Sequence, residues 1–528
     1  MSAFGAIRKH SFATYVDALT ALLALFSWYL SRGYYEDDAF ISLRYARNLL
    51  DGSGMTWNPG ERVEGYTNFL FILLEAALGR LDMDLALASR VISFAAFFGL
   101  LAVLRRYLCR QPDALHKNAH AALAMAVVGS SVPLLAWCWG GLESVLFALF
   151  STAAVCLALE WLEGGASAKK AAWLGIMLAL ATLTRPEGLI FFAVTAGFFL
   201  PRRANFSPLG WMLCPFALIF LPYMAWRVAY FGHWLPNTYY AKAWGIAPSI
   251  LWPRGLSYLA ECLLLPPWLV PFCAGLLAFA ARAKALTAPM VYLTLLSAVF
   301  FFYIASVGGD FMPYVRFIIP VIPLLALLMY HGAGLLSARS NKRWRDVAFA
   351  LIVCLLMQPA VAESGVQLST GAVSGLAVAG YVKSRWPKGA LVALNPAGAL
   401  PYSAPDYRYI DMLGLLDPHI ARRAIATLRT PGQAFPGHMK GDGAYVLSRK
   451  PDYIIFGMCW GAEKPEFLSD AEIAESPRFR AHYEKITAWI TPPASLLPQL
   501  EAMTGDHVPG LAMNDKNQLR FIFYRRRK

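Results

Sequence analysis

Two adjacent carboxylates, Asp37 and Asp38, stand near the start of the segment EDDAFISLRYARNLLDGSGMTWNPGERVEGYTN, which follows a hydrophobic run. A carboxylate there can deprotonate a hydroxyl nucleophile or hold a divalent cation. Arg44 follows about two helical turns later, and a guanidinium can neutralise a phosphate leaving group. The structural alternative makes Asp37 the cap of a helix that begins near Ala39, with Glu36 and Asp38 as solvated acids of its first turn.

Other polar residues of the same segment and of later loops suit sugar hydroxyls and phosphates. Sugars are bound by amide and carboxylate hydrogen bonds and by aromatic faces, whereas a lipid phosphate needs a cation near an apolar groove. The predicted phosphate-binding cations are Arg44, Lys242 and Arg316. The predicted sugar-binding or acceptor-binding residues are Asn58, Glu61, Glu64, Tyr66, Asn68, Asn237, Tyr239, Tyr240 and Asp310. For each aromatic residue, a place in the interfacial belt of a membrane protein is the alternative.

These residues must be positioned by membrane-spanning helices, because 58% of the chain is hydrophobic and only 15% is charged. The sequence therefore predicts a polytopic α-helical membrane protein whose first hydrophobic segment is an uncleaved span. About eleven segments are long and apolar enough to cross a membrane. They lie near residues 13–31, 84–104, 120–137, 142–161, 171–184, 188–201, 209–230, 256–281, 286–306, 315–337 and 346–361.

The apolar segment TNFLFILLEAALGR is short and contains Glu75, so we interpret it as a re-entrant or interfacial helix within a first outward loop at 32–83. With that choice the Lys and Arg clusters between spans all fall on one side, which the positive-inside rule identifies as cytoplasmic. The polar loops then face the periplasm of a bacterial inner membrane. Topology explains much of the +14 formal net charge, so nucleic-acid binding is not needed to account for it.

From about residue 362 the apolar runs become shorter and alternate with turns. This change predicts a transmembrane module at 1–361 and a periplasmic α/β domain at 362–528. Short strand-like runs separated by Gly and Pro alternate there with predicted helices around 417–428 and 470–486. The strand-like runs are GALVALN, DYRYIDML, GAYVLS, KPDYIIFG and LRFIFYRR. Cys459 is the single cysteine of this part, so neither a disulfide framework nor a paired-cysteine zinc site is expected.

The opening segment, LPNTYYAK, GGDFMPYVRFIIPVIP, YIDMLGLLDPHIA, GHMK and KPDYIIF together resemble, in this order, one family of membrane enzymes. This is the mycobacterial terminal arabinofuranosyltransferase (AftB-like) family of GT-C membrane glycosyltransferases. The resemblance covers most of the chain and implies a GT-C bundle, interfacial helices in the first outward loop, a periplasmic domain and a polyprenyl-phosphate-sugar donor. It also implies that Asp37 and Asp38 form the catalytic site, with Asp38 slightly favoured as the base.

The expected reaction transfers a single sugar, with D-arabinofuranose favoured, by an inverting displacement. Asp38 or Asp37 deprotonates an acceptor hydroxyl, which attacks the anomeric carbon as the lipid phosphate leaves. The acceptor is a glycan, a lipid-linked molecule or a protein of the cell envelope. No cofactor is assigned, although a divalent cation held by the two aspartates stays open. Transfer of a preassembled oligosaccharide, membrane transport and a non-catalytic scaffold are the alternatives; a transporter would place its charges at mid-membrane rather than in outward loops.

Overall fold

The computed structural model describes two main parts of the chain, a helical bundle and a C-terminal domain. The residues it describes are Leu25, Tyr29, 32–110, 117–165, 167–201, 207–264, 269–282, 284–337, 368–505 and 508–527. The predicted spans at 13–31, apart from Leu25 and Tyr29, and at 346–361 lie outside these residues, as does the predicted domain boundary between residues 361 and 362.

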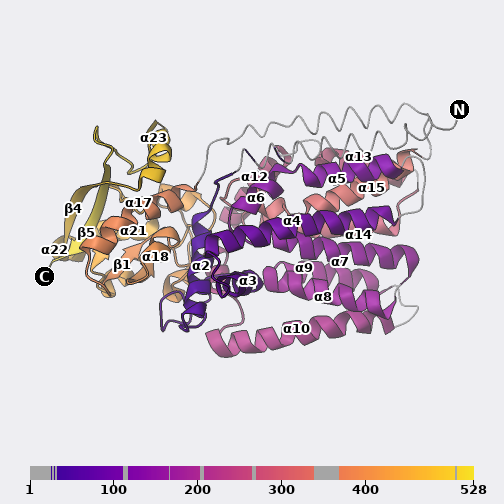
Figure 1. Cartoon of the computed structure of the whole chain (residues 1–528), viewed down its shortest axis with the longest axis horizontal. Helices are drawn as coiled ribbons and strands as arrows, with labels where there is room; N and C mark the ends of the chain where they lie inside the picture. The colour runs from indigo at the N-terminus through magenta and orange to yellow at the C-terminus, as the bar shows by residue number, and fades with distance from the viewer. Residues whose placement is uncertain are drawn as a thin grey trace.

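Apolar helices pack side by side in the bundle (Figure 1). Five stretches of the described residues are long and apolar enough to cross a membrane, namely Leu85–Cys109, His120–Trp139, Ser144–Gly164, Pro208–Phe231 and Ala288–Ser306. The total of about eleven spans stays a prediction. The helices of the bundle are α4 (Leu85–Cys109), α5 (Lys117–Gly129), α6 (Val132–Trp139), α7 (Ser144–Gly164), α8 (Ala168–Thr184), α9 (Gly188–Phe199), α10 (Ser207–Phe231), α13 (Leu269–Arg282), α14 (Ala288–Ser306) and α15 (Ile322–Ser337).

Three of the predicted spans are not single regular helices. The 120–137 segment divides into α5 and α6, where Pro133 occupies the first turn of α6, a position that does not require a backbone N–H. The 256–281 segment is shared by α12 (Pro248–Leu264) and α13. The 315–337 segment begins with the 3-10 helix η1 (Arg316–Ile318), and α15 starts only at Ile322.

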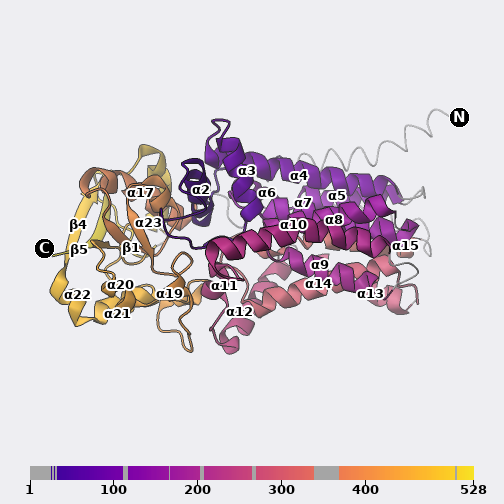
Figure 2. The same ribbon diagram turned by 90° about the horizontal axis from the view of Figure 1, so that it is seen from below.

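The first outward loop contributes two helices beside the bundle. Helix α2 (Asp37–Leu50) lies between the bundle and the C-terminal domain (Figure 1). Helix α3 (Phe69–Gly79) is apolar and has 11 residues, fewer than the roughly 20 that a span requires. Near the same boundary, the short helix α11 (Asn237–Lys242) follows the end of α10 (Figure 2).

The C-terminal domain contains a five-stranded mixed sheet with the strand order β2-β1-β3-β5-β4. The strands are β1 (Leu391–Leu394), β2 (Arg408–Asp411), β3 (Tyr453–Ile454), β4 (Tyr483–Ile490) and β5 (Leu519–Arg526). β1 pairs in parallel with β2 and β3, whereas β5 is antiparallel to β3 and β4. Trp386, which ends helix α17 (Thr370–Arg385), stacks on Tyr453 with ring centroids 3.9 Å apart. This contact fixes α17 against the sheet.

The remaining helical elements of the C-terminal domain are short. They are α18 (Ala399–Ser403), α19 (Pro418–Ala421), η2 (Pro431–Ala434), α20 (Gly443–Ser448), α21 (Leu468–Glu475), α22 (Pro477–His482), η3 (Ala494–Leu496) and α23 (Leu497–Gly505).

The predicted α/β character of this domain is confirmed, but three element assignments were wrong. GAYVLS is helix α20 rather than a strand, because Asp442 caps it by accepting a hydrogen bond from the Tyr445 backbone N–H at 2.9 Å. The helix predicted at 417–428 is only the four-residue α19. The helix predicted at 470–486 is instead two short helices, α21 and α22, and the residues from Tyr483 onward pair with β5 as strand β4.

Candidate functional site

A cavity of about 340 Å³ lies where the bundle, the first outward loop and the C-terminal domain meet. Its walls come from α2, α11 and the loops that precede α7, α9 and η1, and the C-terminal domain adds Leu415, Pro436 and Gly437. Five further predicted site residues line it together with Asp38 and Lys242. Those five are Tyr66, Asn68, Tyr239, Asp310 and Arg316.

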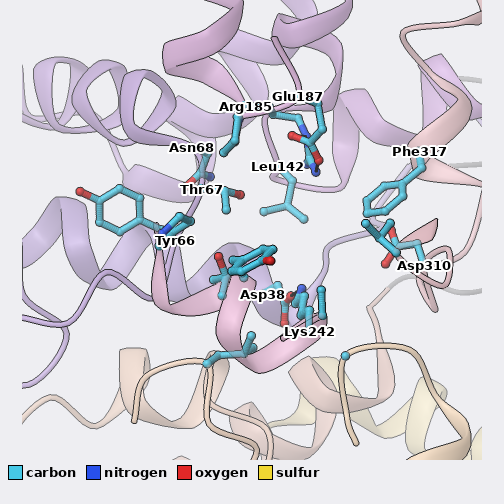
Figure 3. Close-up of a pocket in the computed structure, with 18 of the residues that line it drawn as sticks. Asp38, Tyr66, Thr67, Asn68, Leu142, Arg185, Glu187, Lys242, Asp310 and Phe317 are labelled. Carbon is cyan, nitrogen blue, oxygen red and sulfur yellow. Dashed lines mark hydrogen bonds and ion pairs between the residues drawn. The ribbon is translucent and has the colours of Figure 1, made fainter. Parts of the chain in front are cut away.

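Asp38 and Lys242 lie side by side on one wall of the cavity (Figure 3). The distance between Asp38 Oδ2 and Lys242 Nζ is 3.9 Å. Both side chains remain partly exposed, at 22% for Asp38 and 34% for Lys242. Among the described residues, Lys242 is the only ion-pair partner of Asp38. The Asp38 carboxylate therefore has free oxygen lone pairs directed to a space that a ligand can enter.

Arg316 lies on another wall, paired with Asp310. Its Nε donates to Asp310 Oδ2 at 2.8 Å, and the two side chains are only 6% and 4% exposed. The guanidinium also lies 5.5 Å from the ring centroid of Trp137 and 5.4 Å from that of Phe317. Val315, immediately before η1, has a left-handed backbone with a φ of 42°, which is uncommon for a β-branched residue. Such strain is tolerated where surrounding contacts fix the conformation.

Another cation that lines the cavity, Arg185, is buried. Its Nη2 donates to Glu187 Oε1 at 2.7 Å and its Nη1 pairs with Glu143, and all three side chains line the cavity. Tyr303 donates its hydroxyl to Glu187 Oε1 at 3.0 Å. Glu143 was not predicted as a site residue. Its sequence signal was only its place in the outward loop WCWGGLES, and nothing in the sequence connects that loop to Arg185.

Tyr66 and Asn68 line the cavity, as the sequence led us to expect. Asn68 donates from Nδ2 to Ser42 Oγ at 2.9 Å and to Glu143 Oε2 at 3.0 Å. These bonds fix the orientation of the amide, and its Oδ1 has no hydrogen-bond partner among the described residues. Tyr66 is buried, with its ring edge-on to that of Tyr45 at 4.8 Å.

Asp37 does not line the cavity, although it directly precedes Asp38. Its carboxylate accepts the backbone N–H groups of Gly398 at 3.0 Å and Ala399 at 2.8 Å, at the start of α18. Gly398 is required there, because a Cβ would lie 1.9 Å from the Asp37 carbonyl oxygen. Glu36, rather than Asp37, is the N-cap residue of α2. Burial raises the pKa of Asp37 to about 7, and the two N–H donors oppose that shift.

Arg44 also points away from the cavity, into the interface between α2 and the C-terminal domain. Its Nε donates to the Trp57 carbonyl at 2.7 Å, and its Nη atoms contact the carbonyl oxygens of Pro401 and Tyr407. Asn58 exchanges hydrogen bonds with the backbone of Tyr409 in β2. Glu61 pairs with Arg408 at 2.6 Å. These three residues, which the sequence predicted to bind ligand, instead connect the first outward loop to the C-terminal domain.

Three further predicted residues do not line the cavity and contact neighbouring elements instead. Asn237 donates from Nδ2 to the carbonyl oxygens of Gly414 and Leu415, each at 2.9 Å. Tyr240 lies under the guanidinium of Arg422 at 4.3 Å. Glu64 forms a buried ion pair with Arg227 at 2.7 Å.

The Glu64–Arg227 pair joins the first outward loop to α10, and its side chains are 5% and 7% exposed. We expect Glu64→Gln to lower the free energy of unfolding by about 3–5 kcal/mol, because it leaves a buried guanidinium without its counter-charge. Thermal unfolding of the detergent-solubilised chain would measure the loss. The double variant Glu64→Gln/Arg227→Met should regain much of that stability. Equal destabilisation by the single and double variants would contradict this explanation.

No metal is assigned to the site. The described residues include no group of three His, Cys, Asp or Glu side chains arranged to hold a metal ion. His233 is exposed in the connection between α10 and α11.

Comparison with known proteins agrees with the resemblance noted in the sequence. Residues 361–509 match a family model described as a domain of unknown function (DUF8728). A terminal β-(1→2)-arabinofuranosyltransferase of Corynebacterium glutamicum is 27% identical over 64% of this chain and 53% of its own length. The protein of the same name from Mycobacterium tuberculosis is 27% identical over 51% of this chain and 44% of its own. The chain thus spans about half the length of these curated relatives.

Among solved structures, the fold resembles that of ArnT from Cupriavidus metallidurans bound to undecaprenyl phosphate. The TM-score is 0.53 and the sequence identity 13%, and the match covers 97% of this chain and 98% of ArnT. A match at this identity shows the fold alone. The predicted GT-C architecture, a membrane-embedded helical bundle followed by a C-terminal domain, is therefore confirmed.

Proposed function

We propose that the protein is a GT-C glycosyltransferase that moves a single sugar, D-arabinofuranose, from a polyprenyl-phosphate donor to an acceptor hydroxyl of the cell envelope. The observation that carries this proposal is the cavity in which a partly exposed carboxylate, Asp38, faces Lys242 while Arg316 lies on another wall. The arabinofuranosyltransferase relatives support the choice of sugar. The positive-inside pattern supports a bacterial inner membrane with the cavity and residues 362–528 on the periplasmic side.

In the proposed reaction, Asp38 is the general base. Its carboxylate takes the proton of the acceptor hydroxyl, whose oxygen forms a bond to the anomeric carbon. The bond between that carbon and the lipid phosphate oxygen breaks, and the phosphate leaves with the electron pair. A single displacement of this kind inverts the anomeric configuration. A general base of this kind typically contributes a factor of about 10² to 10⁴ to the rate.

Lys242 and Arg316 are the proposed phosphate-binding cations. Arg316 is held by Asp310, so its charge is fixed in place before the donor binds, which reduces the reorganisation needed in the transition state. Lys242 pairs with Asp38, and at 34% exposure its ammonium can also turn toward a phosphate oxygen. Asn68, Tyr66 and Tyr239 are the proposed sugar contacts, because they line the same cavity.

Asp37 is proposed as a positioning residue rather than a second base, since its carboxylate is used by the N–H groups of α18. A cavity of about 340 Å³ falls at the small end of the usual range for ligand pockets, which supports transfer of one sugar at a time.

The test is sugar transfer by the purified full chain from synthetic polyprenyl-phospho-D-arabinofuranose to arabinofuranosyl oligosaccharides. Turnover with this donor would support both the reaction and the sugar. Turnover only with other polyprenyl-phospho sugars would keep the reaction class and discard arabinose. Failure with every lipid-linked donor, in a preparation that still binds polyprenyl phosphate, would reject the enzyme assignment.

A further inference from the structure

A strip of aromatic and polar side chains leads from the cavity onto the C-terminal domain. Its members are Tyr239, Tyr240, Trp244, Arg422, His419 and Tyr445, and we refer to it as the aromatic strip. Figure 2 shows α11, which carries Tyr239 and Tyr240, next to α19, which carries His419, at the boundary between bundle and C-terminal domain, and these helices pack together. The strip therefore continues across that boundary.

The inner half of the strip begins at the cavity itself, because Tyr239 is one of the residues that line it. The rings of Tyr239, Tyr240 and Trp244 are in mutual contact, with centroid separations of 5.5, 6.5 and 6.2 Å. Tyr239 is 39% exposed and Trp244 is 53% exposed. Aromatic surface is thus presented to the exterior directly beside the place where the acceptor hydroxyl must react.

The outer half belongs to the C-terminal domain. Arg422 lies over the Tyr240 ring at 4.3 Å and is held there by the Pro418 carbonyl at 3.0 Å. His419, three residues earlier and therefore on the same helical face, is 55% exposed and stacks on Tyr445 with ring centroids 4.0 Å apart. The imidazole of His419 is also held in place by a polar contact, since its Nε2 lies 3.2 Å from Asp442 Oδ2.

This combination favours a carbohydrate ligand over lipid. Sugar rings stack their C–H faces on aromatic side chains while their hydroxyl groups bond to neighbouring polar groups, and the strip offers both along its length. Its outer half contains Arg422 and is bordered by Asp442 and Arg449, and these ionisable side chains would be costly to place against hydrocarbon.

We propose that the aromatic strip is an acceptor subsite that binds the sugar residues of an oligosaccharide beyond the one that reacts. The acceptor is accordingly a glycan chain that lies across α11 and α19, with its reactive end in the cavity at Asp38. This inference rests on the proposed glycosyl transfer and narrows its acceptor to a chain of several sugars.

The experiment compares an arabinofuranosyl hexasaccharide with a disaccharide as acceptors for the purified chain and for its Trp244→Ala and His419→Ala variants. Both side chains are more than half exposed, so their removal should leave the fold intact. Trp489→Ala is the matched control, because Trp489 is 47% exposed on strand β4 and is not part of the strip. Calorimetric binding of the hexasaccharide, without donor, gives a second readout that does not require turnover.

We expect each strip variant to raise the KM and the Kd for the hexasaccharide about three- to tenfold, a typical loss for one aromatic contact. The KM values for disaccharide and donor should not change. Equal effects on both acceptors, as a role in membrane anchoring would produce, or an equal effect of Trp489→Ala would overturn the proposal. If no sugar is transferred by any variant, the proposed function fails, whereas hexasaccharide binding that the strip variants weaken would still support a glycan-binding strip.

Discussion

An Asp38→Asn variant is expected to transfer sugar roughly 10²- to 10⁴-fold more slowly than the unmodified protein, with little change in donor affinity. The amide keeps the size of the carboxylate but cannot take the proton of the acceptor hydroxyl. Among the described residues Asp38 has a single ion-pair partner, Lys242 at 3.9 Å, so the substitution removes no close hydrogen bond that supports the fold. Single-turnover transfer with a saturating lipid-linked donor measures the chemical step directly.

The neighbouring Asp37→Asn variant is the informative comparison, because the sequence alone treats the two carboxylates as a pair. The amide oxygen introduced by this substitution can take the place of only one of the two carboxylate oxygens that now accept N–H groups at the start of α18. We expect a loss of about 1–3 kcal/mol in the free energy of unfolding. At a temperature where the variant is folded, its transfer rate should stay within about tenfold of the unmodified protein, because Asp37 acts through position rather than proton transfer. Abolished transfer in Asp37→Asn combined with a normal rate in Asp38→Asn would reverse the two assignments.

The sequence was a good guide to which loops meet at the cavity, because that is a question of topology. Hydrophobic length and the distribution of Lys and Arg decide which loops share a face of the membrane. Loops on the same face lie close together at the ends of the spans. The positions of the spans therefore already predict that Lys242, Asp310 and Arg316 lie near one another. The same argument brought Asp38 to the site.

The direction of each side chain in the first outward loop could not be predicted in the same way. This loop contains residue types that are typical of ligand binding, such as Arg44, Asn58 and Glu61. Each of the three nevertheless contacts the C-terminal domain, at residues more than 300 positions later in the sequence. Those residues are Pro401, Tyr407, Tyr409 and Arg408. Local spacing carries no information about such contacts. Helix α20 shows the same limit at smaller scale, because the six residues GAYVLS suit a strand or a helix, and the Asp442 cap decides between them.

The second large effect concerns Arg316, whose replacement by glutamine should lower kcat roughly 10²- to 10³-fold. Its guanidinium is the more deeply buried of the two proposed phosphate-binding cations, at 6% side-chain exposure, and charge stabilisation is strongest where water is excluded. Donor KM should rise less than kcat falls, because the leaving phosphate gains negative charge in the transition state. Steady-state transfer at varied donor concentration separates the two constants.

Replacing Arg316 also leaves Asp310 without its buried ion-pair partner, so a lower kcat has two possible causes. An unpaired buried carboxylate is expected to destabilise the fold by several kcal/mol, and that loss alone could lower activity. The double variant Arg316→Gln/Asp310→Asn removes both charges, so it should recover the unfolding midpoint but not kcat. If the double variant recovers kcat as well, the role of Arg316 is to neutralise Asp310, and the phosphate is stabilised instead by Lys242 or by Arg185. The distinction matters for the mechanism, since Arg185 already shares its charge with two carboxylates and Arg316 with only one.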